Sequence, residues 1–202
     1  MSFFDALGLE DTDMSDKIDI RTYVSDMITV EHHILQPVKK QLEEDEVAGL
    51  PAAKTVLTKI KDLLELHISD LDEHLASLGG HPASGLKAGV GDTLGALAAA
   101  VQDFRKTKLS KGLRDDYAAL SLAAVAYEML YTTPLSLGSQ ETAELAIRHL
   151  KDITSSIMDL TRLVVDVVVA ELFEINPTLD NTVGEKSKQA IIDAWRPDAV
   201  TV

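Results

Sequence analysis

The sequence predicts an all-α protein in which four long helices form two hairpins joined by a long crossover. The chain is 46% hydrophobic but only 4% aromatic, which favours aliphatic cores between helices over aromatic-rich strands. Hydrophobic residues recur at helical spacing over four long segments. The first and last connections between these segments are short, whereas the middle one exceeds about thirty residues. We therefore expect a four-helix bundle with a C-terminal extension.

The length of the chain, 202 residues, favours one domain. Residues 1–14 are acidic and show no periodicity, so we expect a disordered tail there. Residues 15–175 would form the bundle. Residues 176–202 follow the helix-breaking pair Asn176 and Pro177 and would form an extension with one short helix.

The first predicted hairpin pairs a helix from Ser15 or Asp16 to about Glu46 with a helix over residues 52–78. Either Ser15 or Asp16 can cap the first helix through its side-chain oxygen. Pro37 removes one backbone hydrogen bond inside that helix, so a kink is expected there. A short turn then connects the two helices.

A glycine-rich stretch over residues 79–91 ends the second helix. A short amphipathic helix over 92–106 is expected within the crossover. The third and fourth helices are predicted over 113–133 and 141–174, and the last short helix over 185–195. The fourth helix would be about 50 Å long, which is longer than its partners.

Composition excludes several classes of function. The formal net charge of −14 and the lack of a Lys and Arg run predict no nucleic-acid partner. The chain has no cysteine, so disulfides, thiolate metal sites, iron–sulfur clusters and a cysteine nucleophile are excluded. The N-terminus has no basic signal region, and the valine-rich stretch near the end is short and interrupted by Asp166. We therefore expect a cytoplasmic protein without a membrane partner.

Two isolated acids mark a candidate site. Glu128 is the only charged residue between Asp116 and Glu141, and Glu31 lies in the apolar middle of the first helix. We expect both side chains to point into the bundle, where a buried charge is costly unless it is paired, protonated or bound to a metal. A protonated or hydrogen-bonded core glutamate is the simpler interpretation.

The second and fourth helices each carry a His-x-x-Asp pair on an apolar stripe. The pairs are His67 with Asp70 and His149 with Asp152, and positions three apart can address the same point. With Glu31 and Glu128 they offer the carboxylates and imidazoles that two hard or borderline divalent ions require. His74 follows one turn later and is expected to be structural, and His32 and His33 are expected to be solvated.

At these residues the sequence resembles the ferritin-like superfamily, whose pattern is Glu, Glu-x-x-His, Glu, Glu-x-x-His on successive helices. It is most similar to the bacterial stress-associated YciE/YciF-type branch, and the resemblance covers about residues 20–160. It implies two irons, or iron and manganese, and oxidation of Fe(II) or consumption of peroxide or oxygen in stress defence. The motif acids would fall at Leu64 and Ala146, which cannot bind metal, and Asp70 and Asp152 replace them from the other side. No catalytic residue is assigned.

Other functions fit parts of the sequence. In a metal-free interaction protein, the valine-rich end of the fourth helix would bind its copy in a homodimer, unless the last helix folds back over it. The valines concerned are Val164, Val165, Val167, Val168 and Val169. A hemerythrin-like oxygen carrier needs about five histidine ligands, and only one histidine lies on the fourth helix. A ferritin storage cage is disfavoured by the C-terminal extension.

Overall fold

The computed structural model describes residues 19–80, 108–180 and 182–195, and all the secondary structure in these ranges is helical. The predicted tail over 1–14 and the predicted crossover helix over 92–106 lie outside the described residues. The described helices are α1 (Ile20–Leu42), α2 (Asp45–Gly49), α3 (Pro51–Ser77), α5 (Leu109–Ser136), α6 (Gln140–Ile175) and α7 (Val183–Trp195). The prediction of an all-α protein is confirmed.

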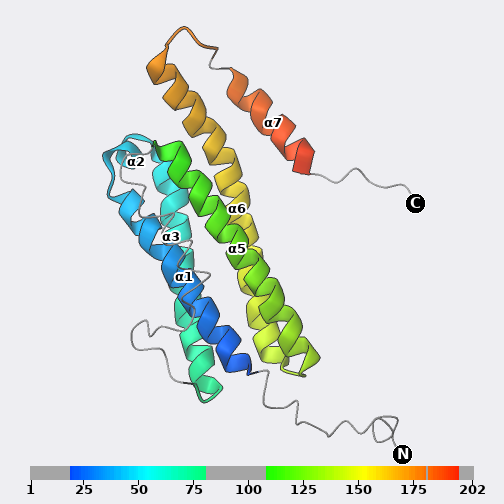
Figure 1. The fold of residues 1–202 in the computed structure, drawn as a ribbon. Helices are drawn as coiled ribbons and strands as arrows, with labels where there is room; N and C mark the ends of the chain where they lie inside the picture. The colour runs from blue at the N-terminus through cyan, green and yellow to red at the C-terminus, as the bar shows by residue number, and fades with distance from the viewer. Residues whose placement is uncertain (1–18, 81–107, 181, 196–202) are drawn as a thin grey trace, which may run out of the picture.

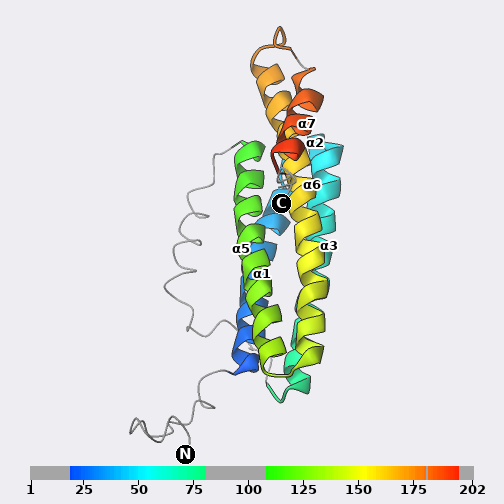
Figure 2. The same cartoon turned by 90° about the vertical axis from the view of Figure 1, so that its right-hand side faces the viewer.

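The four long helices, α1, α3, α5 and α6, lie side by side (Figure 1). α1 contacts α3 and α5, and α6 contacts the same two helices from the other side. α1 and α6 run in one direction, and α3 and α5 run in the opposite direction (Figures 1 and 2). This arrangement is compatible with two hairpins in a four-helix bundle.

The bounds of α1 and α5 differ from the prediction. α1 begins at Ile20, where the side chain of Asp19 accepts a hydrogen bond from the backbone N–H of Arg21, and ends at Leu42. The short α2 follows as a separate helix. α5 begins at Leu109, four residues before the predicted start, because Glu171 of α6 caps its first turn. The Glu171 carboxylate accepts from the backbone N–H of Ser110 at 2.8 Å and from its hydroxyl at 2.7 Å.

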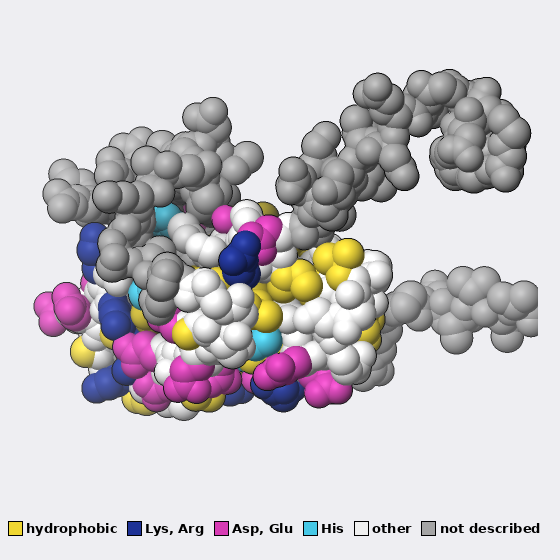
Figure 3. All heavy atoms as spheres, turned by 90° about the horizontal axis from the view of Figure 1, so that it is seen from below, with side chains coloured by type: hydrophobic (Ala, Val, Ile, Leu, Met, Phe, Trp, Pro, Cys, Tyr) yellow, Lys and Arg dark blue, Asp and Glu magenta, His cyan; other side chains and the backbone are white. Residues whose placement is uncertain are grey.

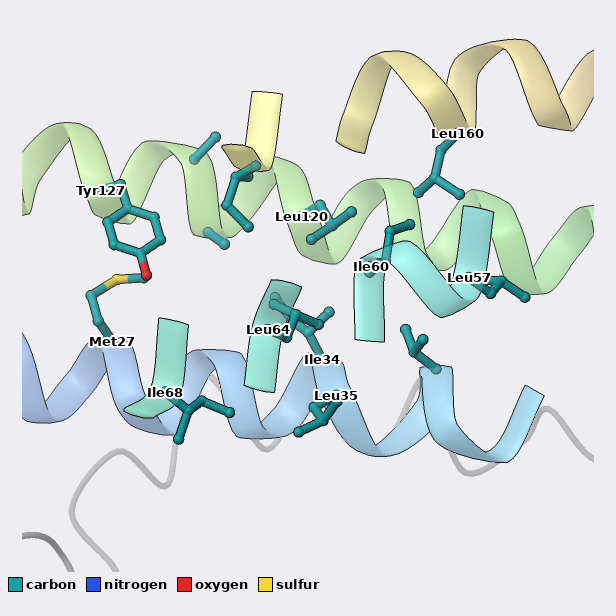
Figure 4. Packing of buried hydrophobic residues seen from close by; sticks show 14 of the residues in the cluster. Met27, Ile34, Leu35, Leu57, Ile60, Leu64, Ile68, Leu120, Tyr127 and Leu160 are labelled. Carbon is teal, nitrogen blue, oxygen red and sulfur yellow. The ribbon is translucent and has the colours of Figure 1, made fainter. Parts of the chain in front are cut away.

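The core lies between the four long helices and consists mainly of aliphatic side chains (Figure 4). α3 contributes Leu57, Ile60 and Leu64, which are fully buried. Tyr127 is the largest fully buried side chain in the described residues. Its ring extends from α5 towards Met27 on α1, so a polar hydroxyl reaches the middle of an apolar core (Figure 4).

α7 folds back beside the end of α6 that extends past the other helices (Figure 1). Lys188 pairs with Asp166 at 2.7 Å, and a Cβ on the buried Gly184 would lie 3.7 Å from Val169. Val165 and Val167 are buried, whereas Val168 is 37% exposed. The folded-back last helix, which was the alternative to a valine-rich dimer surface, is thus what the structure contains.

Acidic and basic side chains are interspersed along one edge of the end-on view from below (Figure 3). None of the described helices combines the length and the apolar character that crossing a membrane requires.

Candidate metal centre

Four polar side chains, one from each long helix, meet in the core. They are Glu31 of α1, His67 of α3, Tyr127 of α5 and His149 of α6, and none is more than 2% exposed. Glu31 Oε1 lies 3.0 Å from His67 Nδ1 and 2.5 Å from the Tyr127 hydroxyl. The same hydroxyl lies 3.0 Å from His149 Nδ1. We call these four residues the central cluster.

Helical spacing places each member of the central cluster on a buried face. Glu31 lies between Met27 and Ile34 or Leu35, one turn away on either side. His67 lies between Leu64 and Leu71, which are both fully buried. The apolar stripes of α1 and α3 therefore carry these polar groups into the core.

The two imidazoles stack on each other. The Nδ1 atom of each ring, here called the inner nitrogen, contacts a core residue, and the Nε2 atom, the outer nitrogen, lies near an aspartate of the opposite helix. The rings of His67 and His149 are 3.8 Å apart and nearly parallel. His67 Nε2 lies 3.5 Å from Asp152 Oδ2, and His149 Nε2 lies 3.4 Å from Asp70 Oδ2. The Asp70 side chain is 39% exposed and that of Asp152 52% exposed. Each inner nitrogen thus faces the core, and each outer nitrogen faces a carboxylate at the surface between α3 and α6.

Burial dominates the titration of the central cluster. It raises the pKa of Glu31, although the nearby His67 and Tyr127 partly oppose the shift. Burial and repulsion by His67 lower the pKa of His149 to about 4. Burial and the neighbouring Glu31 carboxylate raise the pKa of Tyr127 well above its usual range. At neutral pH, His149 is therefore neutral and Tyr127 keeps its proton.

The central cluster has fewer protons than polar contacts. Its five contacts are the three around Glu31 and Tyr127 and the two from the histidines to the aspartates. A neutral imidazole carries one proton and a phenol carries one, whereas an ionised carboxylate carries none. With both imidazoles neutral and Glu31 ionised, three protons are available for the five contacts. If both outer nitrogens donate to the aspartates, both inner nitrogens offer lone pairs to the core.

A second observation also indicates a missing positive charge. Glu31 Oε2 is buried and has no hydrogen-bond partner. An unpaired buried carboxylate oxygen is costly, and a cation next to it removes that cost. Ligand atoms of Glu31, His67 and His149 all lie within 4.8 Å of one another. The donor set and its spacing therefore fit a metal ion.

The prediction that Glu128 points into the bundle is wrong, because its side chain is exposed. The buried face of α5 carries Leu120, Ala123, Tyr127 and Leu130. One residue further along a helix turns the side chain by about 100°, which places Glu128 outside. α5 is apolar on nearly every side, so the sequence did not show which face is buried.

The other predicted ligands divide into two groups. Glu31, His67 and His149 come together as predicted, whereas Asp70 and Asp152 lie at the outer edges of the imidazoles. His74 is buried and contacts the Thr142 hydroxyl at 2.8 Å, in agreement with the structural role expected for it. Burial lowers its pKa.

Tyr127 is the member of the central cluster that the sequence analysis did not assign to the site. It takes the position on α5 that Glu128 was expected to occupy. The spacing of Leu120, Ala123, Tyr127 and Leu130 was the available signal. If the opposite face of α5 were polar, this spacing would have identified Tyr127 as a residue of the buried face.

Comparisons with protein-family models, with curated proteins and with solved structures find no match to this chain. The resemblance to the ferritin-like superfamily stays a prediction from the sequence.

Proposed function

We propose that this protein binds a transition-metal ion in the core, between Glu31, His67 and His149. The observation that carries the proposal is the unpaired Glu31 Oε2 in a buried group whose carboxylate and imidazole ligand atoms lie within 4.8 Å of one another. A cation there would pair the buried Glu31 carboxylate.

The chemistry of the donors narrows the choice of ion. Two imidazole nitrogens and one carboxylate suit iron, zinc or manganese better than calcium, which prefers oxygen ligands only. With both Nε2 atoms protonated, Asp70 and Asp152 accept from the imidazoles, as the carboxylate partners of metal-bound histidines commonly do. These contacts fix each ring with its Nδ1 lone pair towards the core.

The proposal takes one ion, although the ligand pattern in the sequence suggested two. Four of the six predicted ligands are carboxylates. Glu128 is exposed, and Glu31 is the one that belongs to the central cluster. A second ion would have to bind Asp70 or Asp152 at the other side of the rings. The alternating directions of the four long helices support a ferritin-like four-helix bundle as the framework (Figure 1).

Iron or manganese at this centre would supply redox chemistry, which suits oxidation of Fe(II) or removal of peroxide or oxygen in stress defence. The protein's own residues exclude bulk water, since the members of the central cluster are at most 2% exposed. Before an ion binds, the Tyr127 hydroxyl holds a proton between Glu31 Oε1 and His149 Nδ1. Asp70 and Asp152 are the acidic groups that connect the imidazoles with the surface.

Equilibrium dialysis against Mn(II), Zn(II) and, without oxygen, Fe(II) tests the proposal. We expect one of these ions to bind the wild-type chain, and His67→Gln to weaken binding strongly while circular dichroism shows an intact helical fold. His33→Gln changes a histidine of α1 that lies outside the central cluster and serves as the matched control. Equal binding by all three proteins would place the metal elsewhere. Fe(II) oxidation in air no faster than in buffer would remove the oxidase part of the proposal.

A second candidate function is supported by the outer face of α5. Leu122, Val125 and Met129 follow one another at helical spacing and are 40%, 53% and 55% exposed. An exposed apolar stripe of this kind commonly binds a partner, such as a second copy of the chain. Light scattering on wild type and Val125→Lys tests a dimer on this face. A monomeric wild-type protein would rule out a dimer formed through this face.

A further inference from the structure

The Tyr127 hydroxyl lies where a fourth metal ligand would be expected. It is fully buried and lies within hydrogen-bond distance of both Glu31 Oε1 and His149 Nδ1. Figure 4 shows the ring extending from α5 across the core towards α1. Glu31 and Tyr127 thus occupy corresponding places, each beside the inner nitrogen of one histidine.

Three of the donor–donor distances within the central cluster are slightly shorter than those around one tetrahedral ion. Donors about 2.1 Å from one tetrahedral ion lie roughly 3.4 Å from one another. The neighbouring donor atoms here are 3.0, 2.5 and 3.0 Å apart, in the order His67, Glu31, Tyr127, His149. Each pair therefore has to separate by less than about 1 Å around an ion.

We propose that Tyr127 is the fourth ligand of the metal and binds ferric iron through its phenolate oxygen. This inference rests on the proposed function, because it requires an ion at Glu31, His67 and His149. As the iron–oxygen bond forms, the phenol O–H bond breaks and its proton is released to the buffer. A hard, anionic phenolate oxygen favours Fe(III) over softer divalent ions. The centre is thereby assigned to iron.

Iron(III) phenolates absorb visible light strongly, which gives a readout independent of activity. The protein is loaded with Fe(II) under argon and oxidised with ferricyanide, which takes one electron from each iron. After desalting, iron per chain and the visible spectrum are measured for wild type, Tyr127→Phe and the matched control Tyr131→Phe. Tyr131 lies one turn further along α5 and is partly buried.

We expect wild type and Tyr131→Phe to bind iron and show the visible band. Tyr127→Phe should retain a large share of the iron and lose the band. Iron in the wild type without a band would overturn the phenolate assignment and leave the metal site intact. Iron absent from the wild type would instead overturn the proposed function. A visible band that persists in Tyr127→Phe would show that the band comes from another group.

Resonance Raman spectroscopy of the wild type adds a test that does not depend on the folding of a variant. Excitation in the visible band should enhance tyrosine ring modes, and these modes should shift when the protein is produced with ring-deuterated tyrosine. Enhanced modes whose frequencies do not change with ring-deuterated tyrosine would contradict a tyrosine ligand.

Discussion

Replacing Asp116 with Asn should stabilise the protein at neutral and alkaline pH. Asp116 of α5 is 4% exposed, and its Oδ1 accepts from Gln41 Nε2 at 3.0 Å while its Oδ2 has no partner. Burial raises its pKa to about 7, and the nearby acids Asp115 and Glu44 add to the shift. Asn keeps the acceptor for Gln41 without the buried charge.

The sign of the effect follows from proton binding. The folded protein holds the Asp116 proton up to about pH 7, and the unfolded chain loses it near its ordinary value of 3.8. Ionisation therefore destabilises wild type progressively from about pH 4 to about pH 7. Each pKa unit corresponds to about 1.4 kcal/mol, so the gain from Asn should reach at most about 4 kcal/mol above about pH 8. At about pH 5 it should be about 2 kcal/mol.

Urea unfolding followed by circular dichroism at several pH values measures the difference between wild type and Asp116→Asn. Other titrating groups occur in both proteins and cancel from the difference. Asp62→Asn removes one exposed charge from α3 and controls for net charge. A difference that stays constant between about pH 5 and about pH 8 would refute the assigned pKa of Asp116.

Four further substitutions test other parts of the structure. Asp70→Asn and Asp152→Asn should each weaken metal binding about 10- to 100-fold in dialysis. Tyr127→Phe in chelator-treated protein should lower the free energy of unfolding by about 1–3 kcal/mol, because two buried partners lose the hydroxyl. Glu171→Ala should cost about 1 kcal/mol in the same assay, because the N-terminal N–H and hydroxyl of Ser110 lose their acceptor.

Each of these has a clear contrary result. Unchanged metal affinity in both aspartate variants would mean that the outer imidazole contacts do not support the ion. A Tyr127→Phe protein as stable as wild type would mean that its hydrogen bonds contribute no net stability. A Glu171→Ala protein as stable as wild type would mean that the contacts of Glu171 with Ser110 do not stabilise the start of α5.

Regular spacing made much of the helical structure predictable. The apolar stripes of α1 and α3 also placed Glu31 and His67 correctly, because on an amphipathic helix the apolar positions define the buried face. α5 gave no such guidance, since Leu122, Val125 and Met129 are apolar and yet exposed. The residue that faces the core there is set by packing against α1 and α6, which one sequence does not show.

The roles of the aspartates depend on distances across the protein. Spacing along α3 and α6 showed that each His and Asp share a face, and this was correct locally. Each aspartate, however, serves the histidine of the other helix, because α3 and α6 run in opposite directions past each other. The cap that Glu171 provides for α5 likewise joins residues 61 positions apart. The spacing of residues along one helix could not predict such contacts between helices.

The most direct test of the metal centre is the metal content of protein produced with iron and manganese in the medium. Plasma mass spectrometry is applied to wild type, Glu31→Gln and Glu128→Gln, with circular dichroism to confirm the helical fold. The core site predicts about one ion per chain in wild type and Glu128→Gln and almost none in Glu31→Gln. Equal metal in all three, or none in any after loading, would contradict a metal centre built on Glu31.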